Sequence, residues 1–509
     1  MGKPTYNRLV TTGDELSSKI ESGIALIKSI AVAAYGVKSG NVIIENRADP
    51  PTISHDGVTN IGAIEVADPI EDMTVATIKQ ASERTNHTAG DGTTLTTILS
   101  CELYTWAKQY MAEHNLSPLE MAKFIESDLT PKIISAIDEK TKHEITPEEL
   151  RGACIVSAGD DGLGELVYDV ISQVGEYGGV NIVYTGNIGV STEITQGLYI
   201  PKGMVSESLF NDRSGGRSAM SDSKAGVPIV ILGNTVSKKD ELADICDRIR
   251  TINYRQVVFI GDINGDALNY LEMVAGRNLL DVAVVKPPAQ TFQVFLEDIA
   301  LYTGGKVYTG ATQDWTIESM GKASAVNITS RETTITGGAG ENSKDVEYAV
   351  SKLKDKAKTA EPRDRAGIES RIARLTAKVA NIYVGGTAAV ERGEVKLRVE
   401  DAICAAKSAI TSGIVPGGGV CLRDIGNTYG LNYLGNPYNL LCSGITTPKN
   451  LKSGFGYNIK TGEPCNMLDE MIVDPSIVIK EAVRNSHSVV AKLITVKVAL
   501  TFEDRTWNF

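Results

Sequence analysis

The spacing of hydrophobic residues in the first 140 positions is typical of amphipathic helices. Apolar residues recur every three or four positions over residues 14–34, and the same period returns over residues 64–106 and 118–137. Between the first two stretches, residues 41–45 and 52–58 have the composition of short strands. The pattern predicts a mainly helical region that is interrupted by one pair of strands.

The pattern changes between about residue 197 and residue 379. Continuous apolar runs at residues 227–232, 257–260 and 281–286 alternate with helical periods at residues 240–251 and 266–277. This alternation is typical of parallel strands covered by helices, so we predict an α/β region. A charged pair of helices over residues 351–378 follows, and the last third of the chain returns to helical spacing, with a final helix to about Leu500.

The turn at residues 89–94 (Ala-Gly-Asp-Gly-Thr-Thr) is the strongest candidate for a binding site in the sequence. A predicted helix follows it directly, so the turn lies at the start of that helix. The start of a helix carries unpaired N–H groups and attracts phosphate. Asp91 would repel a phosphate unless a divalent cation lay between them, and Mg²⁺ binds through few carboxylates plus substrate phosphates. The turn therefore suits a Mg-nucleotide site. A plain helix cap is the alternative, since Asp and Thr are good caps.

Composition narrows the class of protein. A chain of 509 residues with 42% hydrophobic and 22% charged residues is expected to form two or more globular domains. The net charge of −12 argues against non-specific binding to nucleic acid. Seven cysteines without metal-ligand spacing predict reduced thiols in a cytoplasmic compartment. We expect no membrane partner, because no apolar run is long enough to span a bilayer and the N-terminus resembles neither a signal peptide nor a transit peptide.

Six motifs, in order along nearly the whole chain, resemble those of the group I (GroEL-type) chaperonins. They lie at residues 52–58 (TISHDGV), 89–94 (AGDGTT), 398–402 (RVEDA), 417–420 (GGGV), 456–458 (GYN), and 466–469 (NMLD) with 473–475 (VDP). Six ordered matches are far more specific than any one of them. The chain is identified as a divergent, phage-type member of this family.

The resemblance implies a multidomain α/β chaperonin fold. A mainly helical equatorial domain that binds ATP would be built from both chain ends, residues 1–137 and 412–509. A small intermediate domain would comprise residues 138–195 and 380–411. An α/β apical domain that binds substrate would occupy residues 196–379 between them.

The resemblance also implies an ATP-dependent chaperone, which hydrolyses ATP to ADP and phosphate while non-native proteins fold inside a ring cavity. Asp56 and Asp401 would be the catalytic acids, and Asp91 would hold Mg²⁺, with K⁺ as a further candidate ion. The implied nucleotide contacts are Gly36, Asp91, Gly92, Thr93, Thr94, Gly418, Asn458, Ile472 and Asp474. The alternative is a ring scaffold or holdase with weak or lost ATPase activity.

The substrate-binding rim is expected on the apical domain, where apolar side chains would capture unfolded chains. The residues expected there are Met204, Leu209, Phe210, Leu242, Ile245, Leu268, Leu271 and Met273. Helical spacing alone cannot distinguish an exposed groove from a core face, so both interpretations stay open.

Several positions depart from the family pattern. His55 replaces a lysine, Leu95 a third threonine, and Tyr35 the leucine of a Thr-Leu-Gly-Pro loop. Ala377 and Lys378 replace a Gly-Gly pair at the second hinge. These departures leave the ATPase rate, ion dependence and hinge motion open.

Only residues 420–455 separate the GGGV and GYN motifs, fewer than is usual in the family. Residues 426–437 within them are rich in turn residues and poor in helix formers, so sustained helical packing through 426–437 is not expected. In the family this region supplies contacts between two rings. We therefore predict a homo-oligomeric ring, sevenfold by resemblance, with a single ring favoured over a stable double ring. The sequence specifies neither the clients nor the need for a separate co-chaperonin lid.

Overall fold

The computed structural model of the chain describes residues 8–36, 40–45, 51–54, 57–175, 178–185, 187–212, 217–222, 224–288, 292–310, 315–341, 343–359, 362–376, 378–386, 389–443 and 451–502. The chain divides into two compact units. Unit 1 comprises Met1–Asp169 and Gly386–Phe509, and unit 2 is Val170–Gly385. The finer division into three domains stays a prediction. No helix in the described ranges is long and apolar enough to cross a bilayer.

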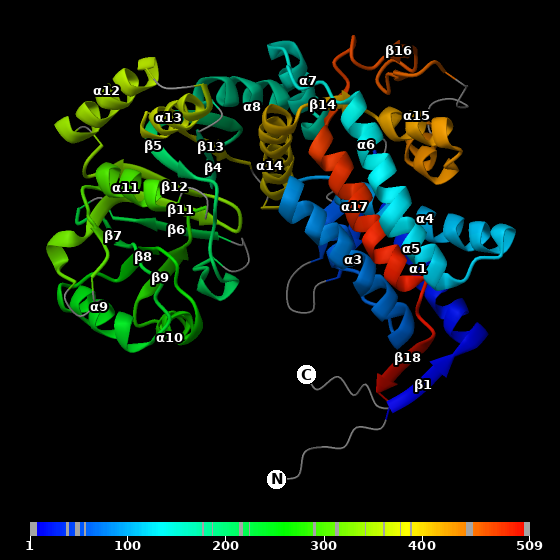
Figure 1. The fold of residues 1–509 in the computed structure, drawn as a ribbon, viewed down its shortest axis with the longest axis horizontal. Coiled ribbons are helices and arrows are strands. Elements are labelled where there is room, and N and C mark those ends of the chain that lie inside the picture. The colour runs from blue at the N-terminus through cyan, green and yellow to red at the C-terminus, as the bar shows by residue number, and fades with distance from the viewer. Residues whose placement is uncertain are drawn as a thin grey trace. The chain divides into compact units, whose positions relative to one another are not determined.

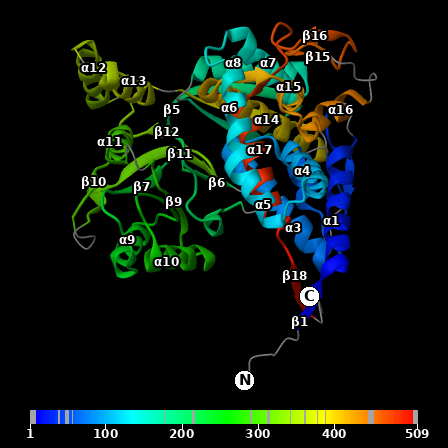
Figure 2. The ribbon, with the colours of Figure 1, turned by 45° about the vertical axis from the view of Figure 1, so that its right-hand side comes forward.

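Unit 1 is built around long helices from both ends of the chain. Helices α1 (Gly13–Ala33), α3 (Pro69–Ala89) and α4 (Thr93–His114) pack with α17 (Ser476–Leu493) (Figures 1 and 2). Their apolar stripes meet in one core, which includes Ile27, Ile78, Leu99, Leu103 and Val490. The predicted helical period is confirmed here, because the residues that recur at this period are the buried ones.

The remaining helices of unit 1 are shorter except for α14, which has 24 residues. Capping boxes start two of them, with Ser117 and Glu120 before α5 and Thr146 and Glu149 before α7. Their bounds are α2 Gly57–Gly62, α5 Pro118–Phe124, a π-helical turn Ile125–Leu129, α6 Thr130–Lys140, α7 Pro147–Ala158, α8 Asp161–Val174 (which continues into unit 2), α14 Ala389–Ser412, α15 Val420–Tyr429, a 3₁₀ turn Asn432–Gly435 and α16 Asn436–Ser443.

Four two-stranded sheets complete unit 1. Strand β1 (Arg8–Thr12) pairs antiparallel with β18 (Val498–Phe502), so segments from the first and the last part of the sequence lie side by side (Figure 1). The other pairs are β2 (Val42–Ile44) with β3 (Thr52–Ser54), β14 (Ile414–Pro416) with β17 (Val473–Pro475), and β15 (Phe455–Tyr457) with β16 (Pro464–Asn466). The predicted second strand therefore ends at Ser54, and a helix begins at Gly57.

One expectation about the last third of the chain is confirmed and another is wrong. No helix is sustained through residues 426–437, because α15 ends at Tyr429, a 3₁₀ turn covers Asn432–Gly435 and α16 begins only at Asn436; this part of the chain is nevertheless packed, and it buries Tyr433, Leu434 and Tyr438. Large apolar side chains compensate there for poor helix propensity, since tertiary packing outweighs local preference. The final helix ends at Leu493, and the residues up to 502 include strand β18 instead.

Unit 2 contains a ten-stranded mixed sheet with helices packed on it. Its strands run in the order β4-β13-β5-β12-β11-β7-β8-β9, with β10 beside β7 and β6 beside β11. Their bounds are β4 Gly179–Tyr184, β5 Val190–Ile200, β6 Arg217–Ser221, β7 Val227–Leu232, β8 Gln256–Ile260, β9 Asp281–Val285, β10 Val307–Tyr308, β11 Gly321–Thr329, β12 Thr333–Gly338 and β13 Lys378–Val384.

The predicted α/β alternation is confirmed in unit 2. Strands β7, β8 and β9 are parallel neighbours, and helices α9 (Asp240–Thr251) and α10 (Gly265–Gly276) connect them. All six residues of β7 are buried, as expected for a parallel strand covered on both faces. The unit also contains 3₁₀ turns at Glu207–Leu209 and Ile317–Ser319, and helices α11 Phe292–Thr303, α12 Lys344–Thr359 and α13 Pro362–Leu375.

Candidate functional site

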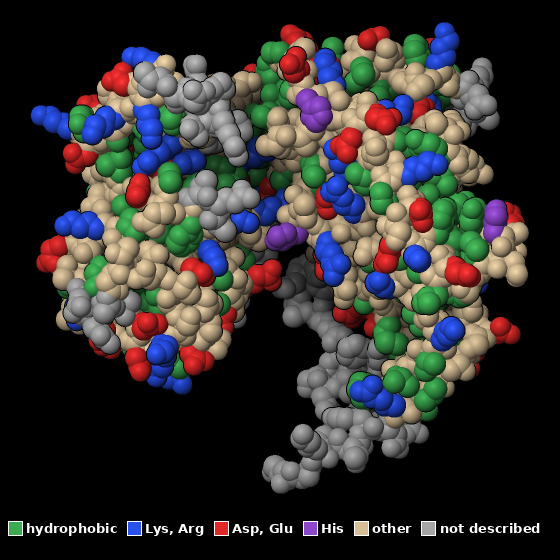
Figure 3. Space-filling model, in the orientation of Figure 1, with side chains coloured by type: hydrophobic (Ala, Val, Ile, Leu, Met, Phe, Trp, Pro, Cys, Tyr) green, Lys and Arg blue, Asp and Glu red, His purple; other side chains and the backbone are tan. Residues whose placement is uncertain are grey.

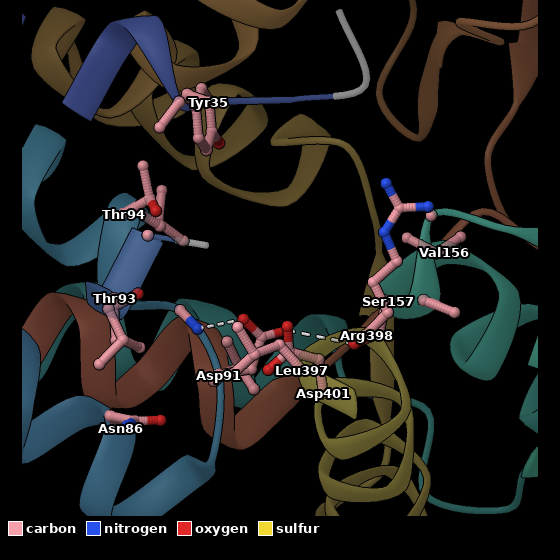
Figure 4. A pocket seen from close by; sticks show the side chains of 18 of the residues that line it. Tyr35, Asn86, Asp91, Thr93, Thr94, Val156, Ser157, Leu397, Arg398 and Asp401 are labelled. Carbon is pink, nitrogen blue, oxygen red and sulfur yellow. Dashed lines mark hydrogen bonds between the residues drawn. The ribbon is translucent and has the colours of Figure 1, made fainter. Parts of the chain in front are cut away.

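The turn between α3 and α4 presents a carboxylate at the start of a helix. Gly90 and Gly92 both have left-handed backbone conformations, with φ of 80° and 88°, and Asp91 lies between them. The Gly92 N–H donates to Asp91 Oδ1 at 2.5 Å, and the Ser157 hydroxyl donates to Oδ2 at 3.4 Å (Figure 4). These two contacts fix the orientation of the Asp91 carboxylate.

Packing requires glycine at Gly92 in addition to the backbone conformation. A Cβ atom at this position would lie 2.7 Å from Cγ1 of Val478 on α17. Buried hydroxyl pairs hold α3 and α4 together behind the turn, with Ser82 to Thr97 at 2.6 Å and Thr96 to Thr85 at 2.9 Å. The turn is therefore held rigidly between three helices of unit 1.

The amino end of α4 is available to an anion. Gly92 is the N-cap residue and has no side chain, so no side-chain cap occupies the first N–H groups of the helix. Thr93 and Thr94 form its first turn and line the same cavity as Asp91. Free N–H groups and hydroxyls at a helix start are a suitable cradle for phosphate.

A cavity of about 700 Å³ opens over this turn, and four carboxylates line it: Asp91, Glu394, Asp401 and Asp474. Asp91 comes from the α3–α4 turn, Glu394 and Asp401 from α14, and Asp474 from β17; Glu394 pairs with Arg398 at 2.7 Å, and Figure 4 draws Asp91 and Asp401 among the lining side chains. Residues more than 300 positions apart thus meet in one cavity of unit 1. Gly36, Gly92, Thr93 and Thr94 also line it, so six of the nine expected nucleotide contacts and the expected catalytic residue Asp401 are brought together here.

Asp474 is placed by the pairing of two short strands. Its partner across the β14–β17 pair is Val415, and its carboxylate accepts a hydrogen bond from the Gly418 N–H. Burial, followed by the charge of Asp91, raises the pKa of Asp474 to about 7, which the Gly418 contact partly offsets. Two carboxylates that oppose each other's ionisation favour a cation between or beside them.

The residues present fit a magnesium ion that is shared with phosphates. Within the described ranges, no group of three or more His, Cys, Asp or Glu side chains could enclose a metal ion. A site with one carboxylate from Asp91 matches the way Mg²⁺ binds in nucleotide sites, where phosphate and water supply the other ligands.

Not every expected nucleotide contact lines the cavity. Gly418 lies behind Asp474, with Met467 3.0 Å from the position of a Cβ, and Ile472 packs beside Met467. Asn458 lies in the β15–β16 turn, where its side chain accepts from the Lys460 N–H. Asp56 and His55 lie outside the described residues, so the role expected of Asp56 stays a prediction.

Sequence reasoning missed Tyr35 and Ser157, which also line the cavity. Ser157 lies near the end of α7, and nothing in its local sequence marks it as a site residue. For Tyr35 a signal existed, because it precedes Gly36 in the loop where the sequence departs from the family pattern.

The structure places most of the expected substrate-binding residues in the core of unit 2. Of that set, Met204, Leu209, Phe210, Leu242, Ile245 and Leu271 are all buried there. The expectation of an exposed apolar rim at these six positions is therefore corrected: they pack α9, α10 and the preceding loop onto the parallel strands. Leu268 is only partly buried and Met273 is 38% exposed. On the face that Figure 3 shows, this part of unit 2 carries scattered charged side chains.

Comparison with known proteins identifies the class. Residues 27–425 match the TCP-1/cpn60 chaperonin family, and the chain belongs to this family. The predicted resemblance and the predicted fold class are thereby confirmed, and family membership supports a chaperone function.

Two solved structures share the fold, and both are of the chaperonin gp146 from the bacteriophage EL 2 (Pseudomonas aeruginosa) in the presence of ATP-BeFx. Crystal form II is 18% identical with a TM-score of 0.75, covering 97% of this chain and 100% of that chain. Crystal form I is also 18% identical, with a TM-score of 0.64 and coverage of 97% and 99%. At this identity the likeness establishes the fold alone.

Proposed function

We propose that this chaperonin binds Mg-ATP in the cavity of unit 1, hydrolyses it to ADP and phosphate, and uses the cycle to fold non-native proteins. The observation that carries the proposal is the meeting of Asp91, Asp401 and Asp474 around the uncapped start of α4. A phosphate cradle and acids that can hold a metal ion and a water molecule are the parts that ATP hydrolysis needs. ATP-BeFx in crystals of the phage relative is in keeping with this role.

Each side chain has a proposed task. Asp91 would hold Mg²⁺, which neutralises phosphate charge when it is bound, and Thr93 and Thr94 would donate to phosphate oxygens. Asp401 would accept the proton of the attacking water, with Asp56 as a second acid. Asp474, beside Gly418, would lie at the ribose end of the nucleotide. A K⁺ ion beside the phosphates is part of the proposal.

Replacement of Asp401 tests the chemistry. Asp401→Ala is expected to retain ATP binding and to slow hydrolysis by about 10²–10⁴-fold, the effect typical of losing a general base. Glu400→Ala is the matched control, because Glu400 neighbours Asp401 on α14 but lies outside the cavity lining and pairs with Lys396. Phosphate release and calorimetric ATP binding are measured together. Wild-type hydrolysis in Asp401→Ala would contradict the assigned role.

The same measurement of phosphate release distinguishes the ATPase from the alternative function, a ring scaffold or holdase. A wild-type protein that binds denatured protein but releases no phosphate would replace the folding cycle with passive binding. Retention of Asp91 and Asp401 in one cavity favours the ATPase.

Clients would be held on the remaining apolar surface of α10. Leu268 and Met273 are the two positions of the expected rim that are not fully buried. Exposed methionine suits contact with many different apolar sequences. We therefore place capture of unfolded chains at these two residues.

Ring assembly would use the sheet at the chain ends. Two-stranded sheets are marginal alone, and this one exposes Val10 (65%), Leu500 (50%) and Phe502 (45%). Ile43 on β2 is 72% exposed as well. We propose that β1 and β18 of one subunit pair with the β2–β3 hairpin of the next by strand addition, giving a sevenfold single ring in the cytoplasm.

A further inference from the structure

Tyr35 is a part of the cavity to which the proposed function gives no task. It follows the last turn of α1, where its N–H donates to the Val32 carbonyl at 3.2 Å. The loop beyond it returns to the helix, because the Gly40 N–H donates to the Ala33 carbonyl at 3.0 Å. The backbone that carries the Tyr35 side chain is therefore tied to α1 on both sides.

The neighbouring residue, Gly36, brings the loop into close contact with a second helix, α16. Gly36 has a φ of 88°, and a Cβ atom there would lie 2.5 Å from Cδ2 of Leu441 on α16. The left-handed backbone favours glycine, and any larger residue would also displace the end of the Leu441 side chain. The loop that presents Tyr35 is thus held between α1 and α16.

The phenol group of Tyr35 is directed into the cavity. Figure 4 shows Tyr35 reaching into the pocket from the end of α1, with Thr94 on its side and Asp91 across from it. Its hydroxyl makes no hydrogen bond to the described residues. Burial, followed by the charges of Asp474 and Asp91, raises the pKa of Tyr35. The hydroxyl therefore stays protonated and can donate a hydrogen bond.

A donor that has no acceptor among the described residues, in a cavity with a phosphate cradle, fits a ligand that brings anionic oxygens. We infer that Tyr35 is a phosphate-positioning residue whose hydroxyl donates to a phosphate oxygen of the bound nucleotide. It would hold the phosphate from the side opposite Asp91 and complement the N–H groups of α4. The inference rests on the proposed function, because it needs a nucleotide in this cavity. The leucine that the family pattern has at this position offers no donor.

The experiment compares three proteins by titration calorimetry with Mg-ADP: wild type, Tyr35→Phe and Tyr429→Phe. The substitution at Tyr35 removes only the hydroxyl and keeps the ring. Tyr429 is the control because it lies outside the cavity, over Lys132. We expect Tyr35→Phe to weaken Mg-ADP binding by about ten- to a hundredfold, the effect of losing one hydrogen bond to a charged group. Tyr429→Phe should bind as the wild type does.

Adenosine separates phosphate positioning from a structural effect. Competition by adenosine against a fluorescent adenine nucleotide should give the same adenosine affinity in wild type and Tyr35→Phe, because adenosine has no phosphate. Equal loss of affinity for adenosine and ADP, or a lowered melting temperature of the variant, would overturn the assigned contact, as would unchanged ADP affinity. Failure of the wild-type protein to bind Mg-ADP would refute the proposed function itself.

Discussion

A buried histidine in unit 1 predicts a measurable loss of stability in mild acid. His487 on α17 is 1% exposed and lies between two hydroxyl groups. Its Nδ1 is 2.7 Å from Thr130 Oγ1, and its Nε2 is 3.0 Å from the Tyr433 hydroxyl. Because the Thr130 hydroxyl donates to the Ile125 carbonyl at 2.6 Å, Nδ1 carries the proton and Nε2 accepts from Tyr433. The imidazole is neutral and fully hydrogen-bonded.

Burial lowers the pKa of His487 from 6.5 to about 3. Between these two values the unfolded chain binds a proton at this residue and the folded chain does not. Stability from this group is therefore fully present above about pH 6.5 and falls as the pH is lowered towards 3. The two pKa values give a loss of about 2 kcal/mol between pH 7 and pH 5.

The variant His487→Gln isolates this contribution, since glutamine does not titrate and its amide can still pair with Tyr433. Urea unfolding of both proteins at pH 7 and pH 5 gives four free energies. Fluorescence of Trp106, whose ring lies 5.2 Å from that of Tyr433, reports on this region. The wild type should lose about 2 kcal/mol more than the variant between the two pH values, because all other groups cancel in the difference.

An equal loss in the two proteins would refute the reasoning. It would mean that His487 is charged in the folded state or that the unfolding transition does not include this part of unit 1. A larger loss in the variant would mean that the substitution introduced a titrating contact elsewhere.

Three further predictions follow from the packing, the apical surface and assembly. Gly92→Ala should destabilise unit 1 by about 3 kcal/mol in urea unfolding, because it adds strain at φ 88° and a clash with Val478; Gly159→Ala, with φ 62° and open space, should cost about 1 kcal/mol. Replacement of Leu268 and Met273 by serine should abolish binding of a denatured protein while ATP hydrolysis continues; unchanged binding would place capture elsewhere. Native mass spectrometry should find a species of about 380 kDa, seven copies of a 54.4-kDa chain, with and without ATP. A stable fourteen-copy species would contradict the single ring.

The local parts of the site could be predicted from the sequence. A glycine on each side of Asp91, followed by two threonines and a helical period, is a short-range pattern, and the structure shows the left-handed glycines that it needs. The carboxylates Asp401 and Asp474 could not be placed by such patterns, because their neighbours in space are hundreds of positions away. Only the family resemblance predicted that Asp401 and Asp474 belong to the same site as Asp91. The pairing of β14 with β17 and the packing of α14 are the contacts by which the fold places them there.

The exposed apolar surface of unit 2 could not be predicted in this way. Hydrophobic spacing shows that a helix has an apolar face, but it does not show which other element covers that face. The sequence by itself determined the helices of unit 1, the parallel strands of unit 2 and the glycine-flanked turn at residues 89–94, since each depends on contacts or periods within a few residues. Only the tertiary structure decided that Leu242, Ile245 and Leu271 face the sheet, that Tyr433 anchors a segment of poor helix formers beside His487, and that Tyr35 enters the cavity. Each of these outcomes depends on which distant element supplies the neighbouring atoms.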